Sequence, residues 1–219
     1  MINREYAHIL LDLDGTIIDS GVGVTKSVQY ALAYCGIKET DRARLNRFVG
    51  PPLKDSFMDF YGLTEEQAEV AIEKYRERYV VKGIHENRVY DGIPEVLKTW
   101  HEAGKKLYLC TSKPEIFAEK ILEDLGLARY FDFMGGASLD GVRNRKEEVM
   151  TYVLDRAGIT DRRSCVMIGD RKFDILAAGE MGIDSVGVLY GYGCREEFET
   201  AGATFIVETA VELTERLKL

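Results

Sequence analysis

The sequence predicts an α/β fold: a parallel sheet with helices on both faces, interrupted after its first strand by a small all-helical segment. Three observations lead to this prediction. Short continuous apolar runs, typical of strands buried on both faces, recur along the chain. Beyond Gly83 these runs alternate with helical patterns, as in a parallel sheet. From about Val22 to Val81, by contrast, helical patterns follow one another with no strand signal.

Composition and charge limit the kind of protein this can be. The chain has 219 residues, of which 46% are hydrophobic and 30% charged, an ordinary globular composition. This length allows one good core with room for a second, smaller subdomain. The formal net charge of -8 argues against a general binder of nucleic acid or acidic membranes, although it leaves room for a local basic pocket.

The first residues and the cysteines indicate the compartment. Met1–Glu5 lacks an apolar signal region, and no apolar run reaches the length of a membrane span. The four cysteines show no close pairing, and Cys110 and Cys165 lie in apolar, strand-like runs. We therefore expect buried thiols in a cytoplasmic protein. The three histidines are scattered, which argues against a histidine metal site or a histidine-based triad.

The first predicted strand carries two acidic residues. Residues 9–20 read ILLDLDGTIIDS, in which apolar residues surround Asp12, Asp14 follows, and Gly15 permits a sharp turn. Two ionised acids are costly to bury unless they lie at the carboxyl end of the strand, facing a cleft or a cation. An acidic turn that merely closes the strand is the alternative. A calcium loop is excluded, because no third acidic ligand or closing Glu falls at the required spacing.

Helical patterns then fill the segment up to about Val81. A capping box at Thr64–Gln67 opens the longest of these helices, whose apolar positions follow helical spacing. We expect hinges on either side of the segment, near residues 17–21 and 82–86. Its other helices are predicted at Val24–Tyr34, Arg42–Phe48 and Leu53–Phe60.

Strands and helices alternate in the rest of the chain. Ser112–Glu115 combines capping-box spacing with an early-turn proline, so a helix is predicted to follow the strand that ends at Thr111. A glycine-rich loop, Tyr190–Gly193, follows a later strand. The predicted strands are Lys106–Thr111, Phe131–Gly135, Ser164–Ile168, Ser185–Leu189 and Phe205–Val207. The predicted helices run from Gly92 to about Ala103, from the capping box to about Leu125, over Arg145–Ala157 and Phe173–Met181, and from Thr209 onward.

Polar residues gather where the predicted strands end. In a parallel sheet, ligands bind at the carboxyl ends of the strands. Carboxylates there hold a hard cation, whereas a hydroxyl, helix-start amides and a lysine hold phosphate oxygens. Such a set is what Mg²⁺-assisted phosphoryl transfer needs. The residues concerned are Asp12, Asp14, Thr111, Ser112, Lys146, Asp170 and Asp174.

The order of these residues resembles the haloacid dehalogenase superfamily. Four motifs occur in order over nearly the whole chain, namely Asp12–Thr16, Thr111, Lys146, and Gly169-Asp170 with Asp174. The resemblance implies an enzyme with a Rossmann-like core, residues 1–17 and 84–219. It also implies a helical cap of the first-position type, residues 18–83.

The resemblance implies a role for each acid. Asp12 is the expected nucleophile, which attacks phosphorus in line and becomes an aspartyl-phosphate. Asp14 is expected to protonate the leaving oxygen and then to take a proton from the hydrolysing water. Mg²⁺ is the expected cofactor, held by Asp12, the main-chain carbonyl of Asp14, and Asp170. Asp174 would act through a coordinated water or by orienting a neighbour, although acids also suit the first turn of any helix.

The other site residues are expected to contact the phosphate. Thr111 would hydrogen-bond the phosphoryl group, and Lys146 would balance charge on Asp12 and on the phosphate. Taken alone, Thr111 could be an ordinary strand-end threonine and Lys146 one of several solvated bases at a helix start. Arg171 and Lys172 are expected at the surface beside the site. The expected substrate-binding residues are Gly15, Thr16, Ser112 and Lys113.

Further stretches indicate a branch of the superfamily. Asp14, two residues after the expected nucleophile, favours phosphate-ester chemistry over dehalogenation. Stretches such as Phe48–Leu53 and Gly187–Gly193 resemble a branch that includes phosphoglycolate phosphatase-like proteins and bacterial 5′-nucleotidases, between which the sequence does not discriminate.

The resemblance therefore implies a Mg²⁺-dependent phosphatase acting on a small phosphorylated metabolite such as phosphoglycolate or a nucleoside 5′-monophosphate. Neither nucleic acid nor membrane is an expected partner, and a monomer is the default. A phosphosugar mutase of the same fold, similar to β-phosphoglucomutase, is the first alternative and would protect the aspartyl-phosphate from water. A non-enzymatic receiver domain phosphorylated on Asp is the second. It would explain the acids, the threonine and the lysine but not the helical insert.

Overall fold

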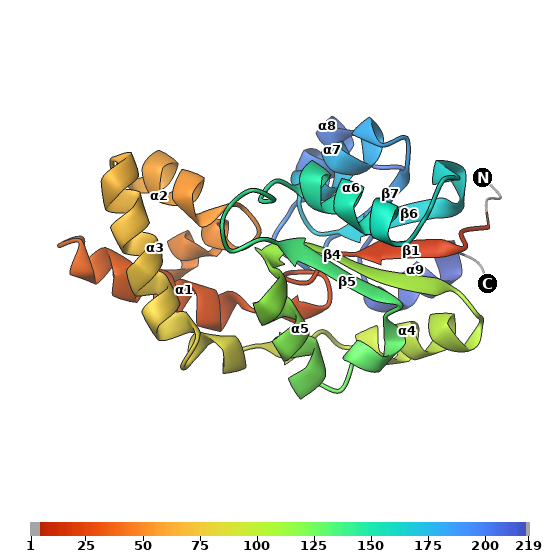
Figure 1. Ribbon diagram of the computed structural model, residues 1–219, viewed down its shortest axis with the longest axis horizontal. Coiled ribbons are helices and arrows are strands. Elements are labelled where there is room, and N and C mark those ends of the chain that lie inside the picture. The colour runs from red at the N-terminus through yellow and green to blue at the C-terminus, as the bar shows by residue number, and fades with distance from the viewer. Residues whose placement is uncertain (1–4, 218–219) are drawn as a thin grey trace. The chain divides into compact units, whose positions relative to one another are not determined.

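A computed structural model describes residues 5–217 of the protein (Figure 1). The chain forms two compact units. The first, the α/β unit, comprises the chain up to Ile18 and from Val89 onward, and the second, the helical unit, comprises Asp19–Arg88. No helix within residues 5–217 combines the length and the hydropathy needed to cross a membrane.

A six-stranded sheet forms the centre of the α/β unit (Figure 1). Its strand order is β5-β4-β1-β6-β7-β8, and every neighbouring pair is parallel. The first strand is thus central, with its residues paired to β4 on one side and to β6 on the other. The predicted fold class is confirmed. The strands are β1 (His8–Leu11), β4 (Lys106–Pro114), β5 (Phe133–Ala137), β6 (Cys165–Gly169), β7 (Asp184–Val188) and β8 (Phe205–Val207).

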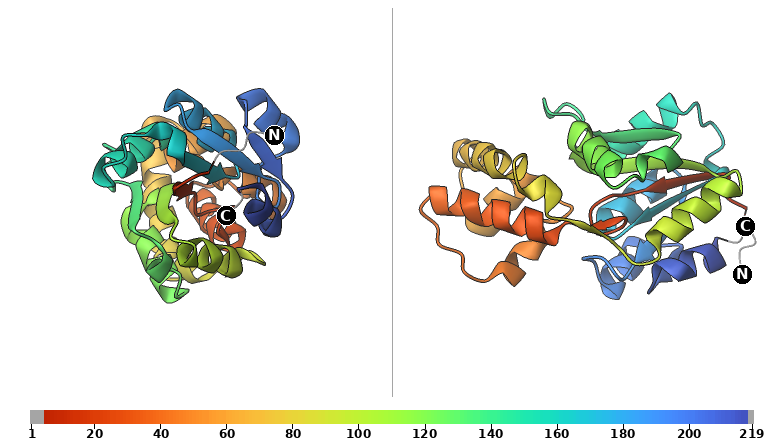
Figure 2. Two further views of the ribbon diagram at one scale, coloured as in Figure 1. Left: turned by 90° about the vertical axis from the view of Figure 1, so that its right-hand side faces the viewer. Right: turned by 90° about the horizontal axis from the view of Figure 1, so that it is seen from below.

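Helices cover both faces of this sheet. In Figures 1 and 2, α6 and α7 lie on one face, whereas α4, α5 and α9 lie on the other. Short 3-10 helices, η3 (Ala128–Tyr130) and η4 (Arg162–Ser164), complete the connections. The helices are α4 (Ile93–Glu102), α5 (Glu115–Asp124), α6 (Lys146–Arg156), α7 (Lys172–Glu180), α8 (Arg195–Ala201) and α9 (Ala210–Arg216).

Burial of β1 on both faces explains its continuous apolar sequence. Leu10 packs in a cluster with Val153 of α6 and Ala178 of α7, while Ile9 and Leu11 are also buried. A strand in this position ends at the middle of the carboxyl edge of the sheet, which is where the site residues converge. Cys110 and Cys165 are free, buried thiols as predicted.

The strand β4 is longer than predicted. It continues through Pro114, which stands at the N-cap of α5 without a side-chain cap hydrogen bond. The prediction that Ser112 opens a capping box is therefore wrong. Proline disfavours the helical conformation of the residue before it, which favours the extended conformation seen up to Lys113. The register against β5 shifts between Thr111 and Pro114, and the main-chain amide of Lys113 donates to Thr111 Oγ1 at 3.2 Å.

The helical unit is helical where the sequence predicts it, with one change of type. Residues 42–48 form a 3-10 helix rather than an α-helix. The unit contains α1 (Gly21–Tyr34), η1 (Arg42–Phe48), α2 (Leu53–Tyr61), α3 (Glu65–Tyr79) and η2 (Gly83–His85). At the two crossings between the units, β2 (Ile18–Asp19) and β3 (Arg88–Val89) pair as a two-stranded sheet, which the sequence does not predict.

The helical unit extends past the expected boundary at residue 83 because of Glu86. Its main-chain oxygen accepts a hydrogen bond from the Gly23 amide at 3.1 Å, and its carboxylate pairs with Lys26 at 2.8 Å and with Arg78 at 2.9 Å. Residues 84–88 are therefore tied to α1 and α3. The boundaries fall at 18/19 and 88/89, against the expected 17/18 and 83/84.

The capping box of α3 is present as predicted. Thr64 Oγ1 accepts from the Gln67 amide at 3.3 Å, and Gln67 Oε1 accepts from the Thr64 amide at 2.9 Å. We expect Thr64→Ala to lower the free energy of unfolding by about 1 kcal/mol, since one helix-start amide loses its partner. Urea denaturation followed by circular dichroism measures this change. Gln67→Glu, which preserves the reciprocal bond, serves as the control. A loss below roughly 0.3 kcal/mol for Thr64→Ala would contradict the role of the cap.

Candidate active site

The turn after β1 brings its two acids to the carboxyl edge of the sheet. The Asp12 amide donates to Ile168 of β6 at 2.9 Å, after which the chain folds back so that the Ile17 amide reaches the Leu13 oxygen at 2.9 Å. Gly15 has a φ of +80°, and a Cβ at this position would overlap the carboxylate of Asp170. Glycine is thus required both by the backbone and by the neighbouring acid.

Three carboxylates form a compact cluster at this edge. Asp12, Asp170 and Asp174 each offer an oxygen, and these oxygens lie within 4.8 Å of one another. All three residues are buried, and Oδ1 of Asp170 has no hydrogen-bond partner among the described residues. Buried acids this close together repel one another unless a cation or a proton offsets their charge. The donor set, all oxygen, is the kind that holds Mg²⁺.

Lys146 supplies one positive charge to the cluster from the N-terminus of α6. Its Nζ lies 3.0 Å from Asp12 Oδ1 and 2.8 Å from Asp174 Oδ1, and it donates to the Cys110 main-chain oxygen at 2.9 Å. The two carboxylate contacts are close ion pairs without a well-directed hydrogen bond at either Oδ1. Lys146 is buried, so the alternative of a solvated base is wrong.

Burial and mutual repulsion set the protonation of this cluster. Burial alone would lower the pKa of Lys146, but the charges of Asp12 and Asp174 outweigh it and raise that pKa above its usual value. Burial raises the pKa of Asp174 to about 6 against the opposing charge of Lys146. Burial, followed by repulsion from Asp12 and Asp174, holds the pKa of Asp170 well above the ordinary range. One lysine is thus too little charge for three acids, and the site has capacity for a further cation.

Asp174 serves both the cluster and its own helix. Its Oδ2 accepts a hydrogen bond from the Arg171 amide at 3.1 Å, which caps α7, while its Oδ1 faces Lys146. A Cβ on Gly169 would overlap this carboxylate, so the glycine before Asp170 makes room for it. The interpretation of Asp174 as an acid of the first helical turn is therefore confirmed, whereas its action through a coordinated water stays a prediction.

The side chain of Asp14 lies outside the cluster and pairs with Lys113. The Nζ of Lys113 donates to both Asp14 carboxylate oxygens, at 2.9 Å and 2.6 Å. Both side chains are largely buried, with 6% of Lys113 and 11% of Asp14 exposed. The second acid of the first motif is thus separated from the three clustered acids and has its own basic partner. Contact of Lys113 with substrate stays a prediction.

The residues predicted to contact phosphate belong to β4 or to the turn after β1. Thr111 is buried, and its hydroxyl oxygen Oγ1 accepts a hydrogen bond from the Lys113 amide. Ser112 is half-buried. Thr16 is fully buried, and its Oγ1 has no hydrogen-bond partner among residues 5–217. Its main-chain oxygen accepts from Tyr190 Oη at 3.1 Å. Contact of Thr16 with substrate stays a prediction.

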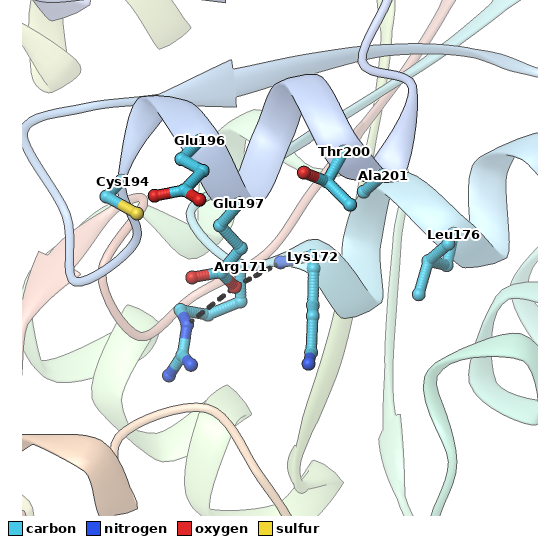
Figure 3. Close-up of a pocket in the computed structure, with 8 residues that line it drawn as sticks. All are labelled: Arg171, Lys172, Leu176, Cys194, Glu196, Glu197, Thr200 and Ala201. Atoms are coloured by element: carbon cyan, nitrogen blue, oxygen red, sulfur yellow. Dashed lines mark hydrogen bonds and ion pairs between the residues drawn. The ribbon is translucent and has the colours of Figure 1, made fainter.

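A cavity of about 440 Å³ lies between α7 and α8. Figure 3 shows Glu197 between Arg171 and Lys172, where its Oε1 accepts from Arg171 Nε at 3.2 Å and from the Lys172 amide at 2.7 Å. Arg171 is only half-buried and ion-paired, whereas Lys172 is an exposed residue as predicted. None of the three clustered acids lines this cavity.

Sequence reasoning gave no role to the segment after β7. The Tyr192 amide donates to Asp170 Oδ2 at 2.8 Å, so this segment contacts the cluster directly. A Cβ on Gly191 would overlap the main-chain oxygen of Gly15 and the Cβ of Asp170. The glycine-rich pattern Tyr190–Gly193 was the visible signal, because glycines often mark close approach of a backbone.

The fold and this site define a class of protein. A doubly covered parallel sheet carries a buried acid after its first strand, a second directly after the neighbouring strand β6, a third in the first turn of α7, and one buried lysine. The model of the haloacid dehalogenase-like hydrolase family matches residues 9–188. The chain belongs to this family, and the predicted enzyme class is confirmed.

Similar proteins agree with this assignment. A 5′-nucleotidase of Pseudomonas aeruginosa is 47% identical over 192 residues, covering 88% of this chain and 86% of that protein. The tyrosine-protein kinase PtkA of Mycobacterium tuberculosis is 36% identical, covering 94% and 70%. A phosphoglycolate phosphatase of Agrobacterium fabrum is 32% identical, covering 84% and 80%. The crystal structure of a predicted phosphatase from Clostridium acetobutylicum superposes with a TM-score of 0.95 at 45% identity, covering 98% and 99%.

Proposed function

We propose that the protein is a Mg²⁺-dependent phosphomonoesterase that works through an aspartyl-phosphate on Asp12. The observation that carries the proposal is the surroundings of Asp12. This buried carboxylate lies at the end of the central strand, 3.0 Å from Lys146 and in one cluster with Asp170, whose Oδ1 has no hydrogen-bond partner among the described residues.

The cluster fits a divalent cation. Asp12, Asp170 and the main-chain oxygen of Asp14 would hold it, with Asp174 beside them. When bound, the cation neutralises carboxylate charge and stabilises charge on the phosphoryl oxygens. The unpartnered Oδ1 of Asp170 and the raised pKa values of Asp170 and Asp174 support this fit, since both mark a shortage of positive charge.

The first half of the reaction forms a covalent intermediate. A carboxylate oxygen of Asp12 bonds to phosphorus while the bond from phosphorus to the ester oxygen breaks, and Asp14 gives its proton to that oxygen. Lys146 offsets charge on Asp12 and on the phosphoryl group as the bond forms. The hydroxyl of Thr111 and the main-chain amide of Ser112 hold phosphoryl oxygens. The Gly15 amide, the other predicted donor, already donates to the Ile18 oxygen at 2.8 Å.

The second half releases phosphate. Water attacks the phosphorus of the aspartyl-phosphate, Asp14 takes the proton from the water, and Asp12 leaves as a carboxylate. The ammonium of Lys113 lies 2.6 Å from Asp14 and holds its carboxylate in place. Asp14 is held apart from the clustered acids, which suits a group that must exchange a proton twice.

The substrate class we propose is a small phosphorylated metabolite, with nucleoside 5′-monophosphates first and phosphoglycolate second. The greater identity to the 5′-nucleotidase, 47% against 32% for the phosphoglycolate phosphatase, supports this order. The helical unit would act as a cap that selects the leaving group. Cytoplasmic location and a monomeric state stay predictions.

A phosphate-release screen with Mg²⁺ tests the substrate class. The panel contains nucleoside 5′-monophosphates, phosphoglycolate, hexose 1-phosphates and a phosphotyrosine peptide. We expect release from nucleoside monophosphates with the highest kcat/KM. Isomerisation of a hexose 1-phosphate without phosphate release would instead indicate a mutase. Transfer from ATP to a protein tyrosine, the reaction in the name of the relative PtkA, would indicate a kinase.

Removal of divalent cations is expected to abolish phosphate release. Treatment with EDTA followed by desalting leaves the three acids with Lys146 alone, so the phosphoryl group meets uncompensated negative charge. Added Mg²⁺ should restore the rate. It should also raise the thermal unfolding midpoint, because a ligand that binds only the folded state stabilises it. Undiminished activity after complete chelation would contradict the proposal.

A further inference from the structure

The segment that follows β7, residues 190–197, approaches Asp170 closely. The Tyr192 amide donates to Asp170 Oδ2 at 2.8 Å. Gly191 and Gly193 lie so close to Asp170 that a Cβ on either would overlap its atoms, the main-chain oxygen in the case of Gly193. One carboxylate oxygen of Asp170 is therefore occupied by the segment, while Oδ1 is left buried without a hydrogen-bond partner among residues 5–217.

The start of the same segment supports the turn that carries the nucleophile. Tyr190 Oη donates to the Thr16 main-chain oxygen at 3.1 Å, and its ring packs against Tyr90 with the centroids 5.0 Å apart. Gly191 closely approaches the Gly15 oxygen. The segment thus joins the turn after β1 to the end of β6, and it fixes the spacing between Asp12 and Asp170.

The end of the segment holds the first turn of α7. Glu197 Oε1 accepts from the Lys172 amide at 2.7 Å and from Arg171 Nε at 3.2 Å. The Arg171 amide in turn donates to Asp174 Oδ2 at 3.1 Å. The Glu197 side chain is 17% exposed, so these bonds are partly shielded from water. Glu197 therefore fixes the backbone between Asp170 and Asp174.

We propose that residues 190–197 are a positioning element for the cation, with Gly191 and Glu197 as its positioning residues. The element orients the Asp170 carboxylate so that Oδ1 is presented to the cation, and it fixes Asp174 relative to Asp170. This inference rests on the proposed function, because it presupposes that the acids bind a divalent cation. Partners that orient a metal ligand without touching the metal commonly change its affinity by about 10- to 100-fold.

The test measures Mg²⁺ binding by the full-length protein without substrate. Isothermal titration calorimetry gives the Mg²⁺ dissociation constant of the wild type, Gly191→Ala, Glu197→Ala and the control Glu196→Ala. Glu196 neighbours Glu197 on α8 and lines the same cavity, but it is exposed. We expect the constant to rise about 10- to 100-fold in Gly191→Ala and Glu197→Ala and to stay unchanged in Glu196→Ala. Because the loss is one of cation affinity, saturating Mg²⁺ should restore most of the phosphate-release rate.

Two results would overturn the inference in distinguishable ways. If the wild type binds Mg²⁺ and both variants bind it with the same constant, residues 190–197 do not position the acids, while the proposed function stands. If the wild type binds no Mg²⁺, the proposed function itself fails and the inference falls with it. Circular dichroism without Mg²⁺ shows whether each variant is folded. Should Gly191→Ala not fold, Glu197→Ala alone decides, because it removes only a half-buried side-chain acceptor and introduces no new backbone contact.

Discussion

Asp12→Asn is expected to reduce phosphate release by at least about 10³-fold without unfolding the protein. The amide lacks the charge and nucleophilicity of the carboxylate, so no aspartyl-phosphate can form at this position. The effect should appear in kcat at saturating substrate, because the step that is lost is chemical. The rate of phosphate release with Mg²⁺ measures it, with the best substrate from the screen.

The stability of Asp12→Asn distinguishes a lost nucleophile from a damaged fold. Asp12 adds to the repulsion that raises the pKa values of Asp170 and Asp174, so removing its charge relieves part of that repulsion. Lys146 keeps Asp174 and the Cys110 oxygen as partners. We therefore expect the free energy of unfolding without Mg²⁺ to stay equal or to rise. Asp91→Asn, at an exposed acid, should leave both activity and stability unchanged.

Lys146→Met is expected to have the largest effect on stability. The substitution keeps most of the side-chain volume but removes the charge that lies 3.0 Å from Asp12 and 2.8 Å from Asp174. Breaking a buried ion pair by removing one partner costs about 3–5 kcal/mol, because a buried charge is left uncompensated. Urea denaturation in EDTA measures this loss. Activity should fall as well, since Lys146 offsets charge on Asp12 during the reaction.

A surface lysine provides the matched control. Lys120 pairs with Asp124 on α5, and its side chain is half-exposed. Lys120→Met should change the free energy of unfolding by less than about 1 kcal/mol, because exposed ion pairs contribute little. Added Mg²⁺ should recover part of the stability of Lys146→Met but not of Lys120→Met, since only the former has carboxylates in need of a cation. Equal losses in the two variants would show that Lys146 is not the counter-charge of the cluster.

The architecture followed from periodicity, whereas details set by tertiary contacts did not. Apolar runs located the central strands, and Thr64 and Gln67 located the start of α3, because these signals are local. The extension of β4 to Pro114 depends on pairing with β5, which no local pattern encodes. The boundary after the helical unit likewise depends on Glu86. Its partners Lys26 and Arg78 lie on α1 and α3, outside the local sequence pattern around Glu86.

The acids of the site could be located from the sequence, but the separation of Asp14 from the other three could not. Motif order placed Asp12 and Asp170 at strand ends with Asp174 nearby, and the structure brings these acids together. The pairing of Asp14 with Lys113 was not predicted, because Lys113 belongs to an extended stretch that the sequence suggested was a helix start. Residues that act on Asp170 through the backbone, as at Tyr192, leave no side-chain signature at all.

Chemical trapping of the intermediate tests the role of Asp12 most directly. The enzyme is quenched during turnover with its best substrate and Mg²⁺, reduced with borohydride, digested, and analysed by mass spectrometry. Borohydride converts an aspartyl-phosphate to homoserine and leaves a free carboxylate unchanged. We predict homoserine at position 12 in the turnover sample and aspartate there without substrate. Aspartate at position 12 under full turnover, or homoserine at another acid, would contradict the assignment of Asp12 as the nucleophile.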